Sequence, residues 1–247
     1  MERRMISVAA RNKAADELAK AKLPPTLYKY CPPERIDILS DLRIRFSPPS
    51  EFNDTFDTQF RPAPSEKMSP SEQAKLKIAR SRRRNQLGIL CLTKDPDNHL
   101  MWVNYARDHK GFVIGFRTDA PFFQADGNGL RGVIYEPPPP DSPEEDACFY
   151  KSEDWKYEKE WRFVRRFGES EDRLVAIHDE NLISEIVFGH RMEDGDISKI
   201  VAYAEDIAPA FLLSTPDHSQ RKFVNKRKAV TPCKHCYGSG YRMEGLR

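Results

Sequence analysis

Short runs of apolar residues, separated by amphipathic or polar segments, define the pattern of this chain. Strands are predicted where apolar residues alternate or run together over a few positions, at 26–32, 43–46, 87–94, 111–119, 132–136, 174–178 and 183–191. The run at 43–46 alternates most clearly, because Ile44 and Phe46 fall on one side and Arg43 and Arg45 on the other.

Helices are predicted from helical spacing and from capping residues, at 8–22, 33–42, 69–86, 95–109 and 193–211. The helix at 69–86 has Ser69 or Ser71 as its cap and Glu72 in the first turn. The next begins near Asp97 or Asn98, and Gly111 is its expected stop. The order of these helices and short strands does not repeat as strand–helix–strand units.

The predicted fold class is therefore α+β, with short mixed or antiparallel strands and surrounding helices in a single main domain. We expect an N-terminal helix within 1–23, the α+β domain at 24–213, and a basic tail at 214–247. The tail begins where the composition turns polar and basic, then rich in cysteine and glycine.

Composition restricts the class of protein. Of the 247 residues, 39% are hydrophobic, which suffices for a packed core, and the formal net charge is only +2. This balance argues against a dedicated nucleic-acid binder but not against a local basic patch, and Arg80, Arg82, Arg83 and Arg84 form one. The apolar runs are too short to span a membrane and the N-terminus lacks an apolar signal core, so we expect a cytoplasmic protein.

The stretch YEKEWRF, at 157–163, contains the most suggestive chemistry. Read as a strand, it places Glu158, Glu160 and Arg162 on one face. The other face then carries Trp155, Tyr157, Lys159, Trp161 and Phe163. Two interpretations stay open: an exposed polar face whose charges pair across strands, or a carboxylate pair lining a cleft, where each glutamate would shift the pKa of the other.

Two further stretches have a structural and a functional interpretation. Trp102, Tyr105 and His109 share one helical face, which favours core packing, but Tyr105 and His109 would also suit a pocket wall that stacks on a base or nicotinamide. The loop at 45–57 contains Ser47 and Asn53, which are typical of turns and equally of ligand-contacting loops.

Cys233 and Cys236 form a C-x-x-C pair followed by glycines, which is half of a tetrahedral zinc site. The remaining ligands would come from His218, a distant cysteine, or the same pair in a second chain, which would make a homodimer through the tail. An unmetallated tail is the alternative.

Several of these stretches together resemble the bacterial family DUF2971, a domain of unknown function. They are LYKYCPPERIDIL, LRIRFSPPSEFNDTFD, LCLTKDPDNHLMWVNYARDHKGFVIGF, VIYE, WKYEKEWRFV and ISEIVFGHRM, in the order of the family and over roughly 26–205. Thr55 stands where the family usually has a proline. The family name implies no established activity.

The E-x-E pair also resembles, more weakly, the motif of the ADP-ribosyltransferases. The resemblance implies NAD as the cofactor, Glu160 as the acid that stabilises an oxocarbenium-like transition state, and Glu158 as the residue that orients a macromolecular acceptor. It would place Tyr28, Tyr30, Arg45 and Ser47 against NAD, although no arginine or histidine occupies the first expected slot. An ADP-ribosyltransferase-like toxin or defence effector is thus one hypothesis. The others are a non-enzymatic binding module and a metal-dependent nucleic-acid enzyme using Asp54 as a third carboxylate.

Overall fold

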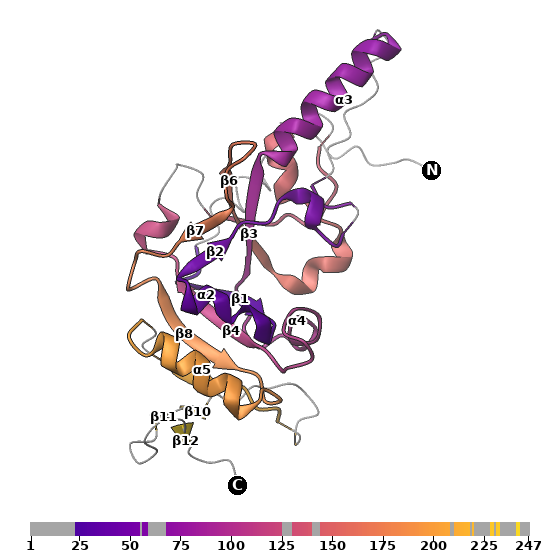
Figure 1. Ribbon diagram of the computed structural model, residues 1–247. Coiled ribbons are helices and arrows are strands. Elements are labelled where there is room, and N and C mark those ends of the chain that lie inside the picture. The colour runs from indigo at the N-terminus through magenta and orange to yellow at the C-terminus, as the bar shows by residue number, and fades with distance from the viewer. Residues whose placement is uncertain are drawn as a thin grey trace. The chain divides into compact units, whose positions relative to one another are not determined.

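The structure is a computed structural model of the 247-residue chain (Figure 1). It describes residues 23–54, 56–58, 68–124, 130–139, 144–207, 210–217, 219, 228–229, 231–232 and 241–242. The predicted N-terminal helix and the Cys233/Cys236 pair lie outside these residues.

The chain divides into two compact units that are interleaved in sequence. The first unit contains 45–91 and 126–173, and the second contains 24–44, 92–125 and 174–247. Strand β3 (Leu87–Thr93) begins in the first and ends in the second. Helices and mostly antiparallel strands occupy separate stretches of the chain, which confirms the predicted α+β class.

The second unit has a sheet in the order β10-β9-β8-β4-β1-β3. Its remaining strands are β1 (Thr26–Cys31), β4 (Phe112–Arg117), β8 (Ile183–Phe188), β9 (Phe211–Leu213) and β10 (Lys228–Ala229). All the pairings in this series are antiparallel except that of β8 with β9. The apolar run of β4 lies between two strands and is buried from Phe112 to Phe116, as expected for a strand covered on both faces.

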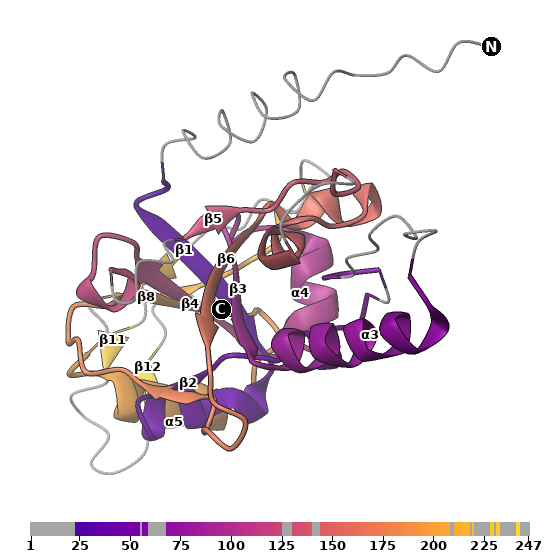
Figure 2. The same ribbon diagram turned by 90° about the horizontal axis from the view of Figure 1, so that it is seen from above.

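Two helices of the second unit pack against each other, α2 (Asp37–Ser40) and α5 (Asp194–Ala204) (Figure 2). The 3-10 helix η1 (Pro33–Ile36) leads into α2. Ile38 and Leu39 of α2 are buried, as are Ile197, Ile200 and Val201 of α5. The helical spacing that predicted α5 therefore marks its buried face, whereas of the spacing that predicted the helix at 33–42 only Leu39 is a buried residue of α2.

Helix α4 (His99–Tyr105) is shorter than predicted. Asn98 is its cap and accepts hydrogen bonds from the backbone of Leu100 and Met101. The helix ends four residues before His109, because Arg107, Asp108 and His109 have φ of 46°, 53° and 66° and so form a left-handed turn. The short 3-10 helix η3 (Pro121–Phe123) follows β4.

The first unit contains β6 (Glu160–Arg166), which pairs with the short strand β5 (Arg131–Gly132). Its long helix α3 (Pro70–Asn85) begins with a complete capping box between Ser69 and Glu72, as predicted. Three 3-10 helices complete it, η2 (Pro49–Glu51), η4 (Glu144–Phe149) and η5 (Glu153–Glu158). Small two-stranded sheets are formed by β2 (Arg43–Arg45) with β7 (Leu174–Ala176) and by β11 (Thr231–Pro232) with β12 (Tyr241–Arg242).

Two strand predictions are wrong in extent. The expected strand at 132–136 is reduced to β5 and an isolated bridge at Ile134. The expected strand through Trp155 and Tyr157 is instead η5, and Lys159, with φ 48°, separates it from β6. The alternation of aromatic and charged residues therefore runs through the end of η5 and into β6, so periodicity alone could not show where the helix ends and the strand begins.

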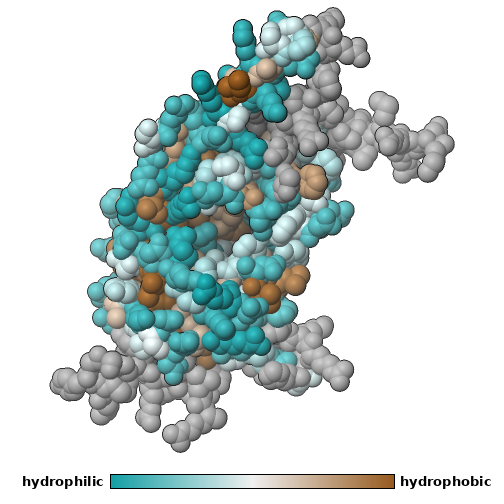
Figure 3. All heavy atoms as spheres, turned by 45° about the vertical axis from the view of Figure 1, so that its right-hand side comes forward, coloured by the Kyte–Doolittle hydropathy of each residue, from teal (hydrophilic) through white to brown (hydrophobic). Residues whose placement is uncertain are grey.

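The exposed face in Figure 3 is mostly hydrophilic, with scattered hydrophobic residues. In the part of the chain that the structure describes, no helix is both long and apolar enough to cross a membrane.

Candidate functional site

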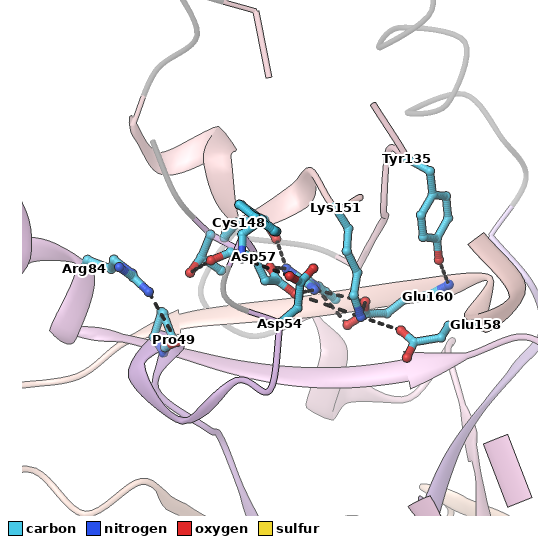
Figure 4. A network of polar contacts seen from close by, with 12 residues as sticks. Pro49, Asp54, Asp57, Arg84, Tyr135, Cys148, Lys151, Glu158 and Glu160 are labelled. Carbon is cyan, nitrogen blue, oxygen red and sulfur yellow. Dashed lines mark hydrogen bonds and ion pairs between the residues drawn. The ribbon is translucent and has the colours of Figure 1, made fainter. Parts of the chain in front are cut away.

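Five charged side chains are buried together in the first unit (Figure 4). We call them the charge cluster: Asp57, Lys151, Glu158, Glu160 and Arg162. Arg162 is 0% exposed and Lys151, the most exposed of the five, only 7%. Lysine and arginine are almost never buried to this degree without partners, so each must be accounted for by its contacts.

Separate segments supply these side chains. Asp57 lies in the loop after η2, Lys151 follows η4, and Glu158 is the last residue of η5. Glu160 and Arg162 lie two residues apart on β6 and so share one face of it. The left-handed conformation of Lys159 turns the chain between Glu158 and Glu160, so that both carboxylates reach Lys151.

Arg162 binds two carboxylates and one carbonyl. Its Nη1 and Nη2 donate to Asp57 Oδ1 and Oδ2 at 2.8 and 2.6 Å, and its Nε and Nη2 donate to Glu160 Oε1 and Oε2 at 2.8 and 2.9 Å. Nη1 also donates to the carbonyl of Cys148 at 2.6 Å. The planar guanidinium thus makes a two-pronged contact with each carboxylate, a geometry that lysine cannot reproduce.

Lys151 joins the two glutamates of the E-x-E pair. Its Nζ donates to Glu158 Oε2 at 2.5 Å and to Glu160 Oε2 at 3.1 Å, and Figure 4 shows it reaching both. Asp57 Oδ2 is 3.9 Å from the same nitrogen, and the Trp155 ring centroid is 4.7 Å away. The lysine is therefore surrounded by anions and by one aromatic face.

Glu160 is bound by both cations of the charge cluster. It accepts three hydrogen bonds from Arg162 and Lys151, and the Cys91 side chain is a further, smaller influence that lowers its pKa. A carboxylate offers about four acceptor positions, so these three hydrogen bonds fill most of them. The backbone N–H of Glu160 donates to Tyr135 Oη at 2.7 Å, which fixes the start of β6 as well.

These contacts determine the charge states. Burial alone would raise the pKa of Glu160, but Arg162 and Lys151 outweigh it and lower the pKa to about 2. Burial would likewise lower the pKa of Lys151, but Glu160 and Glu158 outweigh it and raise that pKa above its usual value. Lys151 and Glu160 are consequently both ionised near neutral pH.

Asp54 adds a fourth carboxylate close to the charge cluster. It is 8% exposed, and its Oδ1 accepts a hydrogen bond from the backbone N–H of Phe56 at 2.9 Å. Its Oδ2 is buried and has no hydrogen-bond partner. The backbone N–H of Asp57 donates to the Asp54 carbonyl at 3.1 Å, which holds Asp54 next to this member of the charge cluster (Figure 4). A buried carboxylate oxygen without a donor is costly, and it marks a position that a cationic or hydrogen-bond-donating ligand would complete.

Of the two interpretations of 157–163, the exposed polar face is wrong, because Glu158, Glu160 and Arg162 are 3%, 5% and 0% exposed. Both faces of β6 are covered from Glu160 to Val164. The alternation was correct in pairing Glu160 with Arg162 on one face, but that face points to the charge cluster and not to water.

The predicted NAD-contacting residues are divided between the two units. Arg45, Ser47 and Asn53 belong to the first, where Arg45 pairs with Glu51 at 2.6 Å and the Ser47 backbone forms a bridge with Ile89. Tyr28, Tyr30, Tyr105 and His109 belong to the second. Tyr30 is buried there, and its hydroxyl donates to the Asp95 carbonyl and accepts from the Asn98 N–H.

His109 is a core residue of the second unit, which confirms the packing interpretation for it and for Trp102. It is 2% exposed, and its ring stacks on Trp102 with centroids 5.3 Å apart. His99 Nδ1 and His109 Nε2 share a hydrogen bond of 3.0 Å, and the His190 ring centroid is 4.6 Å away. Burial, followed by His190, His99 and Arg191, lowers the pKa of His109 to about 3 and keeps the ring neutral.

No group of three or more His, Cys, Asp or Glu side chains among the described residues is arranged to hold a metal ion. The carboxylates of the charge cluster are no exception, because they bind Arg162 and Lys151. The zinc prediction for Cys233 and Cys236 stays a prediction, since neither residue belongs to the described part of the chain.

Sequence reasoning missed Asp57 and Lys151. Asp57 ends the motif FNDTFD, in which the earlier aspartate, Asp54, had been the candidate third carboxylate. Lys151 stands alone after the acidic loop and gives no periodic signal. The number of carboxylates in these motifs was nevertheless a signal. If such acids are buried they require a buried cation nearby, which could have pointed to Lys151.

Comparison with protein families gives one finding. The model of the family described as "Protein of unknown function (DUF2971)" matches residues 101–163, about a quarter of the chain. This segment extends from α4 to the middle of β6 and includes Lys151, Glu158, Glu160 and Arg162, so the resemblance to that family is confirmed over it. No curated protein and no solved structure matches the chain.

Proposed function

We propose that this chain is an NAD-dependent, ADP-ribosyltransferase-like enzyme whose acidic residues belong to the charge cluster. The observation that supports it is the convergence of Glu158 and Glu160 on Lys151 Nζ, at 2.5 and 3.1 Å, in a buried site. Buried ionised groups are costly, and where they occur with shifted pKa values they are candidates for catalysis.

The balance of charge suits a cationic reactant. Among the buried residues that the structure describes here, the four acids Asp54, Asp57, Glu158 and Glu160 outnumber Lys151 and Arg162, so these six residues are negative when all are ionised. In the proposed reaction the bond between the ribose C1′ and the positively charged nicotinamide nitrogen breaks. Its electron pair neutralises the nicotinamide, positive charge develops on the ribose, and an acceptor nucleophile bonds to C1′ and loses its proton. Fixed carboxylates stabilise that developing cation more than the ground state.

The contacts favour different roles for the two glutamates. Glu160 has most of its acceptor positions filled by Arg162 and Lys151, so it is suited to positioning Lys151 more than to accepting a hydrogen bond from substrate. Glu158, which Lys151 holds through Oε2, is the residue that we propose to contact the ribose or the acceptor. This reverses the assignment that the E-x-E resemblance implies.

The test is NAD turnover by the purified full-length chain, with labelled NAD and cell lysate as the source of acceptor. Glu158→Gln should reduce nicotinamide release and label transfer by about 10²–10³-fold at a temperature at which thermal melts show that the variant is still folded. Glu160→Gln should reduce both activity and stability. Glu169→Gln, at an exposed position, is the matched control and should leave both unchanged.

Wild-type activity that survives Glu158→Gln would contradict the role of Glu158. A folded wild-type protein without turnover would favour the second candidate, a non-enzymatic binding module. The paired state of Glu160 supports that candidate, because a buried network of this kind has a sufficient structural role in holding four segments of the chain together.

A further inference from the structure

Helix α3 contributes almost nothing to the core. None of its 16 residues is buried, and only Leu76, Arg80 and Arg84 are half-buried. These three lie four positions apart and form one stripe along the helix, from which Arg84 Nη2 donates to the Pro49 carbonyl. Figure 1 shows α3 running outward from the start of β3. A helix that buries no residue is explained neither by hydrophobic stabilisation nor by the site at β6.

The net charge of α3 is positive, whereas that of the rest of the chain is negative. It carries six of the 40 lysines and arginines but one of the 38 acids, Glu72, which is committed to the capping box. The remaining 34 cations and 37 acids give the rest of the chain a formal charge of −3. Among the helices and strands that the structure describes, α3 therefore carries the largest positive charge. The basic tail at 214–247 is a second positive segment, with eight lysines and arginines and two acids.

The helix dipole explains only part of this concentration. Arg82, Arg83 and Arg84 lie in the last turn, where cations stabilise a helix. Lys75 and Lys77 lie in its middle, where the dipole has little effect. The inner stripe leaves Lys75 and Arg82 on the opposite, outer face, and places Lys77 and Arg83 along its two edges, at about 100° of rotation per residue.

We propose that α3 binds double-stranded DNA through its phosphate backbone. The helix is about 24 Å long at 1.5 Å per residue, and the major groove of B-form DNA admits a helix of this diameter. The outer face carries the small residues Ser71, Ala74 and Ser81 together with Ile78, which is 56% exposed. Lys77 and Arg83 on the two edges would meet the two backbones. The deep, narrow major groove of duplex RNA does not admit such a helix, so DNA is the better fit.

The experiment measures binding of the full-length protein to a fluorescent DNA duplex by anisotropy, over a series of salt concentrations. One variant carries Lys75→Gln, Lys77→Gln, Arg82→Gln and Arg83→Gln, because glutamine has a helix propensity similar to that of lysine and arginine. The control carries Lys94→Gln, Lys110→Gln, Lys156→Gln and Lys199→Gln, which remove the same charge from exposed positions outside α3.

Four phosphate contacts give a slope of log K against log salt of about −3.6, so wild-type affinity should fall about 10²-fold between 50 and 200 mM salt. The α3 variant should lose most of this binding and its salt dependence, and the control should keep both. Circular dichroism of the α3 variant checks that the helix persists.

Three outcomes would overturn the proposal: no wild-type binding to duplex DNA at 50 mM salt, an equal loss in both variants, or α3-dependent binding to vesicles of anionic lipid or to duplex RNA with none to DNA. None of them bears on NAD turnover, so this test and that of the proposed function fail independently.

Discussion

Both units bury polar side chains, but they do so by opposite means. The first unit holds charges of both signs, and each charge is satisfied by side chains from several segments. The second unit holds neutral rings, with His109 stacked on Trp102 and bonded to His99. Burying these rings in the second unit costs conformational free energy in the backbone, because three consecutive residues there adopt positive φ. Left-handed residues cost about 1–2 kcal/mol each, whereas buried ions cost several kcal/mol when a partner is lost. The charge cluster should therefore be the less tolerant of the two.

Removing the central cation of the charge cluster is the most severe test. Arg162→Leu leaves Asp57 and Glu160 without their main donors, and we expect the free energy of unfolding to fall by about 3–5 kcal/mol in urea titrations. Arg166→Leu, at the exposed end of β6, should change it by less than about 0.5 kcal/mol. Similar values for the two variants would show that the buried ion pairs contribute no more than a surface residue.

The second unit is tested through a backbone contact. A Cβ at Gly189 would lie 2.1 Å from the His109 carbonyl oxygen, so Gly189→Ala must displace the left-handed turn. We expect a loss of about 1–3 kcal/mol in the free energy of unfolding, measured in urea. Gly195→Ala is the control, because no atom lies within 4 Å of its added Cβ and it is in α5, where alanine should stabilise by up to about 1 kcal/mol. Equal changes in the free energy of unfolding for the two variants would show that the left-handed turn does not contribute to stability.

Acid should affect the two units in different pH ranges. The pKa of His109 is lowered from 6.5 to about 3, so its contribution is complete above about pH 6.5 and is lost as the pH falls toward 3. The pKa of Glu160 is lowered from 4.5 to about 2, so its contribution is complete above about pH 4.5 and is lost as the pH falls toward 2.

Unfolding free energies measured from pH 7 to 3 should therefore fall less steeply for His109→Gln than for wild type, beginning near pH 6.5. Glu160→Gln should differ in slope only below about pH 4.5. A His109→Gln variant with the wild-type slope would mean that this ring does not titrate on unfolding.

The smallest expected effect concerns the residue that joins η5 to β6. Lys159 has φ 48°, which a β-branched side chain tolerates poorly. Lys159→Val should lower the free energy of unfolding by about 1–2 kcal/mol, and Lys159→Gly should stay within about 0.5 kcal/mol of wild type. Thermal melts of the two variants give the comparison, and a valine variant as stable as the glycine one would deny that the turn is constrained.

Periodicity and capping residues predicted most elements, because local rules decide them: Ser69 and Glu72 define the start of α3, and the apolar run of β4 indicates a central strand. The grouping of Glu158, Glu160 and Arg162 could also be predicted from the sequence. Their burial was not, because it depends on Asp57 and Lys151, which come from distant segments without periodic signals. The end of α4 at Tyr105 could not be predicted either, since Arg107 and Asp108 carry no glycine-like mark of a left-handed turn.

The interleaving of the two units has a consequence for how the chain is made. Strand β1 is synthesised before its partner β4, which begins 81 residues after β1 ends, and β4 must in turn wait for β8. At 5–20 residues per second, β1 waits roughly 4 to 16 s for β4. Its unpaired edge is available to other chains during that time, so the yield of folded protein should depend on translation speed and on chaperones that shield this strand.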